Sequence, residues 1–253
     1  MKITFLGTGT SQGIPVIGCR SDVCSSDDPR DQRLRSSILV EWDNYAYVID
    51  CGPDFRRQML DAKVTNINGI LFTHYHADHT AGLDDIRPFS HKNGSVQFYA
   101  KNDVIENLKE RFAYIFATKN RYIGAPNVVL NEITNKPFSL KNINVIPIEV
   151  LHGTLKIFGY RFNDFTYITD AKNITAKEMG KLQNLKVVVV NALRIDSHPT
   201  HFNLQQSLDF IEEIKPERAF LTHISHKLGF HDEVSKILPE NVFLSFDGLT
   251  VEM

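Results

Sequence analysis

Short runs of apolar residues, separated by polar turns, recur along the whole chain and predict its strands. Many are rich in valine, isoleucine and aromatic residues, which favour extended backbone. In the first half we expect strands at residues 3–6, 37–42, 45–49, 69–72 and 96–100. In the second half we expect them at residues 141–150, 158–162, 166–169, 187–190, 219–221, 242–245 and 249–251. Asp43-Asn44 and Asn163-Asp164 predict hairpin turns, and Pro147 predicts an edge or bulge position.

Five segments between these strands have helical character. We expect helices at residues 55–62, 102–115, 175–182, 204–214 and 232–238. Asp54 is the predicted N-cap of the first helix, and Pro216 closes the fourth. Residues 116–137 show weak periodicity and several loop signals.

Strand groups in both halves are each followed by helix-strand units. This order predicts two sheets packed on one another with helices outside, a four-layer αββα sandwich of the α/β class. No linker rich in proline, glycine and serine divides the chain, so we expect one domain over residues 1–253.

Composition narrows the class of protein. The 253 residues are 42% hydrophobic, which is enough for a sizeable core, and the net charge is −2. Without a basic excess, long nucleic acids are disfavoured as partners, whereas a small phosphate substrate is not. The first residues lack the apolar core of a signal peptide, and no apolar run approaches the roughly 20 residues that cross a bilayer. Three cysteines make a disulfide framework improbable. We expect a cytoplasmic protein without a membrane partner.

The stretch Gly69–Asp85 carries the strongest chemical signal. Its apolar strand is followed by His74, His76, Asp78 and His79, four potential metal ligands within six residues. Polar side chains crowded at the end of a buried strand need partners, and a metal ion satisfies all of them together. Imidazole and carboxylate donors suit zinc, manganese or iron.

Thr73–His79, THYHADH, resembles the THxHxDH signature of the metallo-β-lactamase superfamily. Four further segments are similar to that family in their order along the chain. They are Val48–Gly52 with Asp50, Glu149–Gly153 with His152, Tyr167–Asp170, and Phe220–His223.

The resemblance implies a dinuclear metal centre in a hydrolase. His74, His76 and His152 would hold one ion, Asp78, His79 and His223 the other, and Asp170 would bridge them. Two such ions can share a hydroxide at neutral pH and stabilise charge that develops on a phosphoryl oxygen. Asp50 would accept a hydrogen bond from a ligand imidazole and so fix its tautomer. Replacing Asp78 by alanine is expected to abolish turnover.

Three segments resemble the PhnP-like branch of phosphoribosyl cyclic phosphodiesterases. They are Leu6–Pro15 with Gly18-Cys19, Leu221–His226, and Asp247-Gly248. This resemblance implies a phosphodiesterase that cleaves a small phosphate ester, with a cyclic ester among the candidates. His201 would protonate the leaving oxygen or contact the phosphate, with amides at the start of the 204–214 helix beside it. His198 is the alternate, and we interpret His91 and His231 as surface residues.

The same branch carries a zinc held by a C-x-C-x-x-C loop and a histidine. Here Cys19, Cys24 and His226 match three of its ligands, and Ser21 stands in place of the middle cysteine. Asp22 or water would complete a third metal site, which the loss of one thiolate would weaken. Ordinary thiols and a surface histidine are the alternative. Cys51 is expected to be packed and inert.

Other interpretations remain open at this point. A tRNA-processing nuclease shares the signature, but residues 116–137 are short and weakly basic for an RNA-binding arm. A non-catalytic metal-binding module, a β-lactamase or a thioesterase would have the same fold. The glycine-rich stretch Gly7–Gly13 lacks the Gly-Lys-Ser/Thr ending of a P-loop, so we interpret it as a close backbone turn. The substrate, the metal and a homodimeric state are left open.

Overall fold

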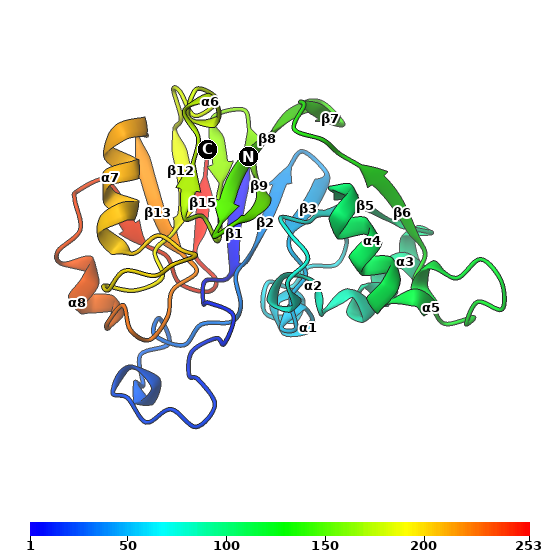
Figure 1. Ribbon diagram of the computed structural model, residues 1–253. Helices are drawn as coiled ribbons and strands as arrows, with labels where there is room; N and C mark the ends of the chain where they lie inside the picture. Colours follow the sequence, from blue (N-terminus) through cyan, green and yellow to red (C-terminus); the bar gives the residue numbers. More distant parts are fainter. The chain divides into compact units, whose positions relative to one another are not determined.

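The computed structural model describes all 253 residues and contains two β-sheets (Figure 1). The chain divides into two compact units. The first comprises Met1–Gly7, Arg35–Thr134 and Gly248–Met253, and the second comprises Thr8–Leu34 and Asn135–Asp247. Each sheet lies wholly within one unit. The single domain expected over residues 1–253 stays a prediction.

The first unit contains a seven-stranded sheet in the order β15-β1-β2-β3-β4-β5-β6. Its strands are β1 Lys2–Gly7, β2 Ser37–Trp42, β3 Tyr45–Ile49, β4 Gly69–Leu71, β5 Val96–Ala100, β6 Val128–Glu132 and β15 Thr250–Glu252. Its helices are α1 Phe55–Asp61, α2 Ala77–Thr80, α3 Arg87–Asn93, α4 Asn102–Arg111 and α5 Ala113–Phe116, with a 3-10 turn at Leu83–Ile86. The strands from β3 to β6 run parallel, whereas β15, β1, β2 and β3 pair antiparallel.

Apolar side chains on one face of this sheet pack against helices of the same unit. Val48, Ile70 and Phe98 of the strands share a buried cluster with Phe55 of α1 and Leu108 of α4. Each large side chain removed from water contributes roughly 1.5–3 kcal/mol. This core holds β3 and β4 side by side, and both strands lead directly into the residues discussed below.

The second unit contains an eight-stranded sheet in the order β11-β8-β9-β10-β12-β13-β14, with β7 also paired to β8. Its strands are β7 Phe138–Leu140, β8 Ile143–His152, β9 Leu155–Phe162, β10 Phe165–Tyr167, β11 Asn173–Ile174, β12 Val187–Asn191, β13 Arg218–Thr222 and β14 Val242–Leu244. Its helices are α6 Ala176–Met179, α7 Leu204–Ile214 and α8 His231–Ser235, with a 3-10 turn at Val23–Ser25. The strands β10, β12, β13 and β14 run parallel.

Strand β12 lies at the centre of the second core. Every residue of its VVVVN sequence is buried, as expected of an inner parallel strand. Val188 and Val190 belong to a cluster with Phe210, Ile211 and Ile214 of α7. Figure 1 shows α7 beside β13 of this sheet.

The glycine-rich stretch makes the close backbone approach that the sequence predicts. A Cβ atom on Gly9 would lie 2.8 Å from the carbonyl oxygen of Arg33. Gly9 also forms a parallel β-bridge with Ile224, and the Ile224 amide donates to Thr8 O at 2.9 Å. The stretch therefore supports the residue that follows His223.

The structure corrects three predicted elements. The helix expected over 102–115 is interrupted at Phe112, whose φ of −120° and ψ of 41° separate α4 from α5. The helix expected over 175–182 covers only Ala176–Met179. Strand β6 lies inside the region 116–137, where we expected no element. On one side, Pro147 of β8 is paired with Tyr160 of β9. On the other side, β7 pairs with β8 only up to Val145 and β11 only from Val150, so Pro147 lies opposite neither strand. This confirms the edge position.

Asp54 does occupy the N-cap position of α1, but its side chain does not cap the helix. The carboxylate accepts hydrogen bonds from the Arg35 amide at 2.8 Å and from the Arg35 guanidinium at 3.0 Å. None of the helices is long and apolar enough to span a membrane.

Candidate metal centre

The loop after β4 gathers four predicted ligands of the first unit. His74 Nε2 lies 3.0 Å from His76 Nδ1, and His79 Nε2 lies 3.1 Å from Asp78 Oδ2. Two ligand atoms on one tetrahedral zinc ion are roughly 3.3 Å apart, since each bond is about 2.0–2.1 Å long. The donor atoms and their spacing therefore fit a divalent metal ion.

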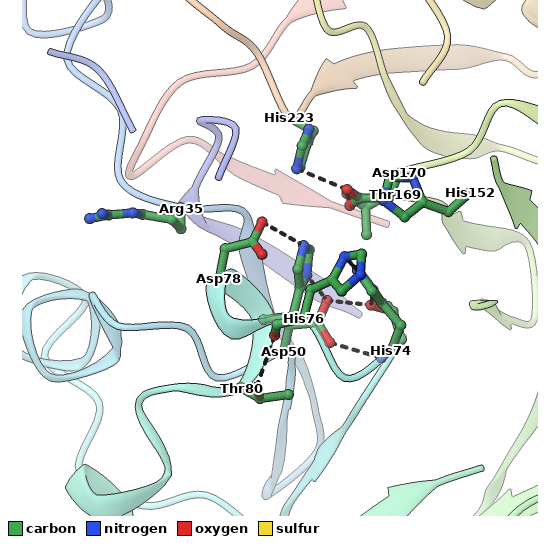
Figure 2. Close-up of polar contacts among 12 residues, drawn as sticks. Arg35, Asp50, His74, His76, Asp78, Thr80, His152, Thr169, Asp170 and His223 are labelled. Carbon is green, nitrogen blue, oxygen red and sulfur yellow. Dashed lines mark hydrogen bonds and ion pairs between the residues drawn. The ribbon is translucent and has the colours of Figure 1, made fainter. Parts of the chain in front are cut away.

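The carboxylate of Asp50, directly after β3, accepts hydrogen bonds from two residues of this loop (Figure 2). Its Oδ1 accepts from the Thr73 amide at 2.8 Å. Its Oδ2 accepts from the Thr73 hydroxyl at 2.8 Å and pairs with His79 Nδ1 at 2.7 Å. Burial raises the pKa of the Asp50 carboxyl above its ordinary value, and the contacts with His79 and Thr73 oppose that shift.

These contacts assign the ring protons of two ligands. A carboxylate accepts only, so His79 donates from Nδ1, and its Nε2 presents a lone pair. The Thr73 hydroxyl spends its proton on Asp50, so it accepts from His74 Nδ1 at 3.0 Å. His74 Nε2 therefore also presents a lone pair. One buried carboxylate thus prepares two imidazoles for a metal ion.

The other end of the loop is tied to α4. The Thr80 hydroxyl donates to His76 O at 2.9 Å, and the Arg111 guanidinium donates to Tyr75 O at 3.0 Å. Arg111 also donates to the Thr80 hydroxyl at 2.9 Å. The histidine loop is therefore fixed at both of its ends.

The second unit holds a second cluster of predicted residues. His152 ends β8, Asp170 follows β10, and His223 follows β13. His223 Nε2 lies 3.1 Å from Asp170 Oδ1, as the dashed line in Figure 2 shows, and His201 Nε2 lies 3.0 Å from the same oxygen. His152, Asp170 and His201 place their ligand atoms within 4.8 Å of one another. The structure thus brings together the four residues predicted for this half of the chain.

Three of the site residues share an uncommon backbone conformation. Asp50, Asp170 and His223 have φ values of 65°, 58° and 54°, in the left-handed region. Each stands at the end of a strand, where this conformation turns the chain sharply. Left-handed residues other than glycine are uncommon and concentrate at functional sites.

The turn at Asp170 is held by Asn191, a residue that the sequence analysis missed. The Asn191 side chain accepts from the Ala171 amide at 2.7 Å and donates to Ala171 O at 3.1 Å. A polar residue at the end of four valines was the available signal, because a fully buried amide needs partners. The Phe202 amide also donates to Ala171 O, which links the His201 loop to this turn.

His201 is only 9% exposed, and its ring lies 4.6 Å from that of His152 and 5.0 Å from that of His223. Burial lowers the pKa of His201 to about 4, which the neighbouring Asp170 partly offsets.

The expectation of free amides at the start of α7 was wrong for three of them. Asn203 and Gln206 form a capping box, and the Leu204 amide donates to Arg194 O.

Cys19, Cys24 and His226 form a third group, also in the second unit. Their ligand atoms lie within 4.8 Å of one another. The Ser21 hydroxyl lies 3.3 Å from Cys19 Sγ and 3.4 Å from the Cys24 amide. Hydrogen bonds from Ser21 lower the pKa of the Cys19 thiol. His226 Nδ1 is buried and makes no hydrogen bond, so the group fits a metal ion. Cys51 is fully buried, and burial raises the pKa of its thiol.

His231 is not the surface residue that we expected, since only 6% of it is exposed. Its amide donates to Asp31 Oδ1 at 2.7 Å, and its Nδ1 lies 3.3 Å from the buried Arg33 guanidinium. Arg33 also donates to the Thr8 hydroxyl at 2.8 Å. This network anchors the long loop between Thr8 and Leu34.

Comparison with known proteins agrees with this fold. Residues 45–224 match the family described as the β-lactamase superfamily domain. A crystal structure of a new diphosphatase from the PhnP family is 39% identical, with a TM-score of 0.93. That similarity covers 100% of this chain and 97% of the diphosphatase. The chain therefore belongs to the metallo-β-lactamase superfamily and, within it, to the PhnP family.

Two curated relatives are longer proteins. An octanoyltransferase from Porphyromonas gingivalis is 38% identical over 253 residues, which are 98% of this chain and 51% of the relative. A ribonuclease Z from Methanocaldococcus jannaschii is 26% identical over 200 residues, 74% of this chain and 56% of the relative. The chain thus spans about half the length of these relatives.

Proposed function

We propose that the protein is a phosphodiesterase that cleaves a small phosphate ester through a dinuclear metal centre. The ligands would be His74, His76, Asp78, His79, His152, Asp170 and His223. The observation that carries the proposal is the proton assignment around Asp50, which leaves His74 and His79 with lone pairs at Nε2. The 39% identity with the PhnP-family diphosphatase supports a phosphate substrate.

When bound, two divalent ions supply a hydroxide at neutral pH and stabilise negative charge on phosphoryl oxygens. The chain's own residues orient these partners. Asp50 and Thr73 hold the ligand imidazoles, and Asn191 holds the turn that carries Asp170. His201 directs its Nε2–H at the Asp170 carboxylate, where that N–H would also donate a hydrogen bond to a phosphate oxygen. Zinc or manganese suits this donor set, and iron is also compatible.

We further propose that Cys19, Cys24 and His226 hold a structural zinc. Three protein ligands leave one position for the Ser21 hydroxyl, for Asp22 or for water. The short distance between Ser21 Oγ and Cys19 Sγ, 3.3 Å, favours Ser21 over Asp22.

Turnover of a substrate panel tests the proposed reaction. The purified protein, with manganese or zinc added, is assayed against cyclic and linear phosphodiesters, a dinucleoside diphosphate and a precursor tRNA. We expect turnover of small phosphodiesters, which the His201→Gln variant reduces. Cleavage of the precursor tRNA alone would favour a nuclease like the related ribonuclease Z, and diphosphate cleavage alone would favour the activity of the related diphosphatase. No turnover by the metal-loaded protein would contradict the proposal in favour of a non-catalytic module.

The proposal also includes the partners of the protein and its location in the cell. The net charge of −2 disfavours long nucleic acids, and nothing in the chain suggests a membrane partner. We place the protein in the cytoplasm, where a small phosphate ester would be its partner.

A further inference from the structure

Thr200 lies at the meeting point of three histidines in the second unit. Its carbonyl oxygen lies 2.9 Å from His152 Nδ1. Its hydroxyl oxygen lies 2.8 Å from His201 Nδ1 and 3.2 Å from His198 Nδ1. One threonine therefore contacts a predicted metal ligand, the predicted proton donor and its alternate.

The partners of these atoms assign the protons. His201 Nε2 faces the Asp170 carboxylate at 3.0 Å and donates to it, so a neutral His201 has its lone pair on Nδ1. His198 Nδ1 accepts from the Thr200 amide at 3.3 Å, so it too presents a lone pair. The Thr200 hydroxyl is then the proton donor at this point. His201 Nδ1 lies only 3.1 Å from His198 Nδ1, so without this donor two lone pairs would face each other and favour a proton on Nδ1. The shorter contact of the hydroxyl, to His201 Nδ1, receives its proton.

The packing of Thr200 limits where the hydroxyl can point. Gly153, in the turn between β8 and β9, has a φ of 61°, and a Cβ atom there would lie 3.0 Å from Thr200 Cγ2. The threonine methyl group is therefore seated against this turn. Both branches of the side chain are fixed, the methyl by Gly153 and the hydroxyl by His201.

We propose that Thr200 is the positioning residue for His201. Its hydroxyl holds the imidazole in the tautomer with the proton on Nε2, so that the N–H points toward Asp170 and the reacting phosphate. This inference rests on the role proposed for His201, whereas the tautomer itself can be measured without any turnover.

Two substitutions test the hydroxyl and the methyl group of Thr200 separately. Thr200→Val keeps the shape and removes the hydroxyl, whereas Thr200→Ser keeps the hydroxyl and removes the methyl. Thr175→Val is the matched control, because Thr175 is exposed and its side chain makes no capping hydrogen bond. Nitrogen-15 NMR of the histidine rings is recorded on the zinc-loaded proteins, and His201→Gln assigns the His201 signals.

We expect wild type, Thr200→Ser and Thr175→Val to show His201 protonated on Nε2, and Thr200→Val to show a mixture of tautomers. In the phosphodiesterase assay, Thr200→Val should lower kcat about tenfold to a hundredfold while KM and metal content stay unchanged. Thr200→Ser should retain most of kcat. An unchanged His201 tautomer in Thr200→Val, or loss of metal from that variant, would overturn the inference. If the wild type hydrolyses no phosphodiester, the proposed function fails, and the NMR comparison still decides the role of Thr200.

Discussion

Asp50 Oδ2 lies 2.7 Å from His79 Nδ1, and both side chains are almost completely buried. The pair joins the end of β3 to the histidine loop after β4. A buried carboxylate is costly to desolvate, so its retention needs strong partners. Here the partners are Thr73 and His79, and the result is a His79 ring whose Nε2 is prepared for a metal ion.

Asp50→Asn should weaken metal binding. The asparagine amide can present a donor to His79 Nδ1, which favours the wrong tautomer. Metal affinity should fall about tenfold to a hundredfold, measured by competition with a metal chelator. Asp43→Asn is the matched control, because Asp43 has a similar φ of 50° in an exposed hairpin turn. Equal metal affinity in the two variants would show that Asp50 does not tune its neighbour.

Asp78→Ala should abolish turnover and leave the fold intact. Asp78 lies in the first turn of α2, and its carboxylate lies 3.1 Å from His79 Nε2, so the substitution removes a polar group and leaves the apolar core unchanged. We expect bound metal to fall by one ion per chain while the circular dichroism spectrum stays that of the wild type. The exposed Asp61→Ala variant controls for loss of a surface carboxylate. Turnover at the wild-type rate in Asp78→Ala would exclude Asp78 from the centre.

Ser21→Cys should strengthen the cysteine-loop zinc site. The Ser21 hydroxyl already contacts Cys19 Sγ and the Cys24 amide, so a thiolate at this position would complete a Cys₃His set. We expect one additional zinc ion per chain to survive dialysis against a chelator. Exposed Ser197→Cys provides a control for adding a thiol elsewhere. Loss of this zinc ion from both Ser21→Cys and wild type would contradict the proposed site.

Asp247 should make stability depend on pH. Burial raises its pKa to about 6 from an ordinary value of 3.8, despite hydrogen bonds from Thr8 and Leu34. The folded state then binds the proton more tightly than the unfolded state, so this group's contribution is full below pH 4 and is lost as the pH rises to 6.

Urea unfolding at several pH values measures that contribution. Asp247→Asn removes the titration, so the difference in unfolding free energy between wild type and variant should shrink as the pH rises from 4 to 6. The same difference at every pH would show that the Asp247 pKa is ordinary in the folded protein.

The sequence predicts the buried strands well because their apolar runs have few alternatives. The VVVV run of β12 and the alternation in β3 each fit one conformation. Strand β6 escaped prediction for a physical reason: it lies at a sheet edge, pairs only with β5, and none of its residues is fully buried. The break at Phe112 also has no breaker residue to mark it.

The site residues divide in the same way, into those that the sequence predicts and those that it does not. The spacing of His74, His76, Asp78 and His79 is local, so the sequence displays it. Asn191 and Thr200 act through contacts 20 and 48 residues distant, with Ala171 and His152, and no local pattern marks such pairs. Asp54 and His231 mislead for the same reason, because their partners Arg35 and Arg33 come from distant segments.

A manganese titration of the metal-free protein tests the central claim most directly. Manganese is used because thiolates select softer ions, so the cysteine site does not add to the number of manganese ions bound per chain. Bound metal is measured by elemental analysis, and hydrolysis of bis(4-nitrophenyl) phosphate is followed at each addition. We expect hydrolysis to rise until two manganese ions are bound per chain and then to stay constant. Saturation at one ion, or two bound ions without hydrolysis of any phosphodiester, would contradict it.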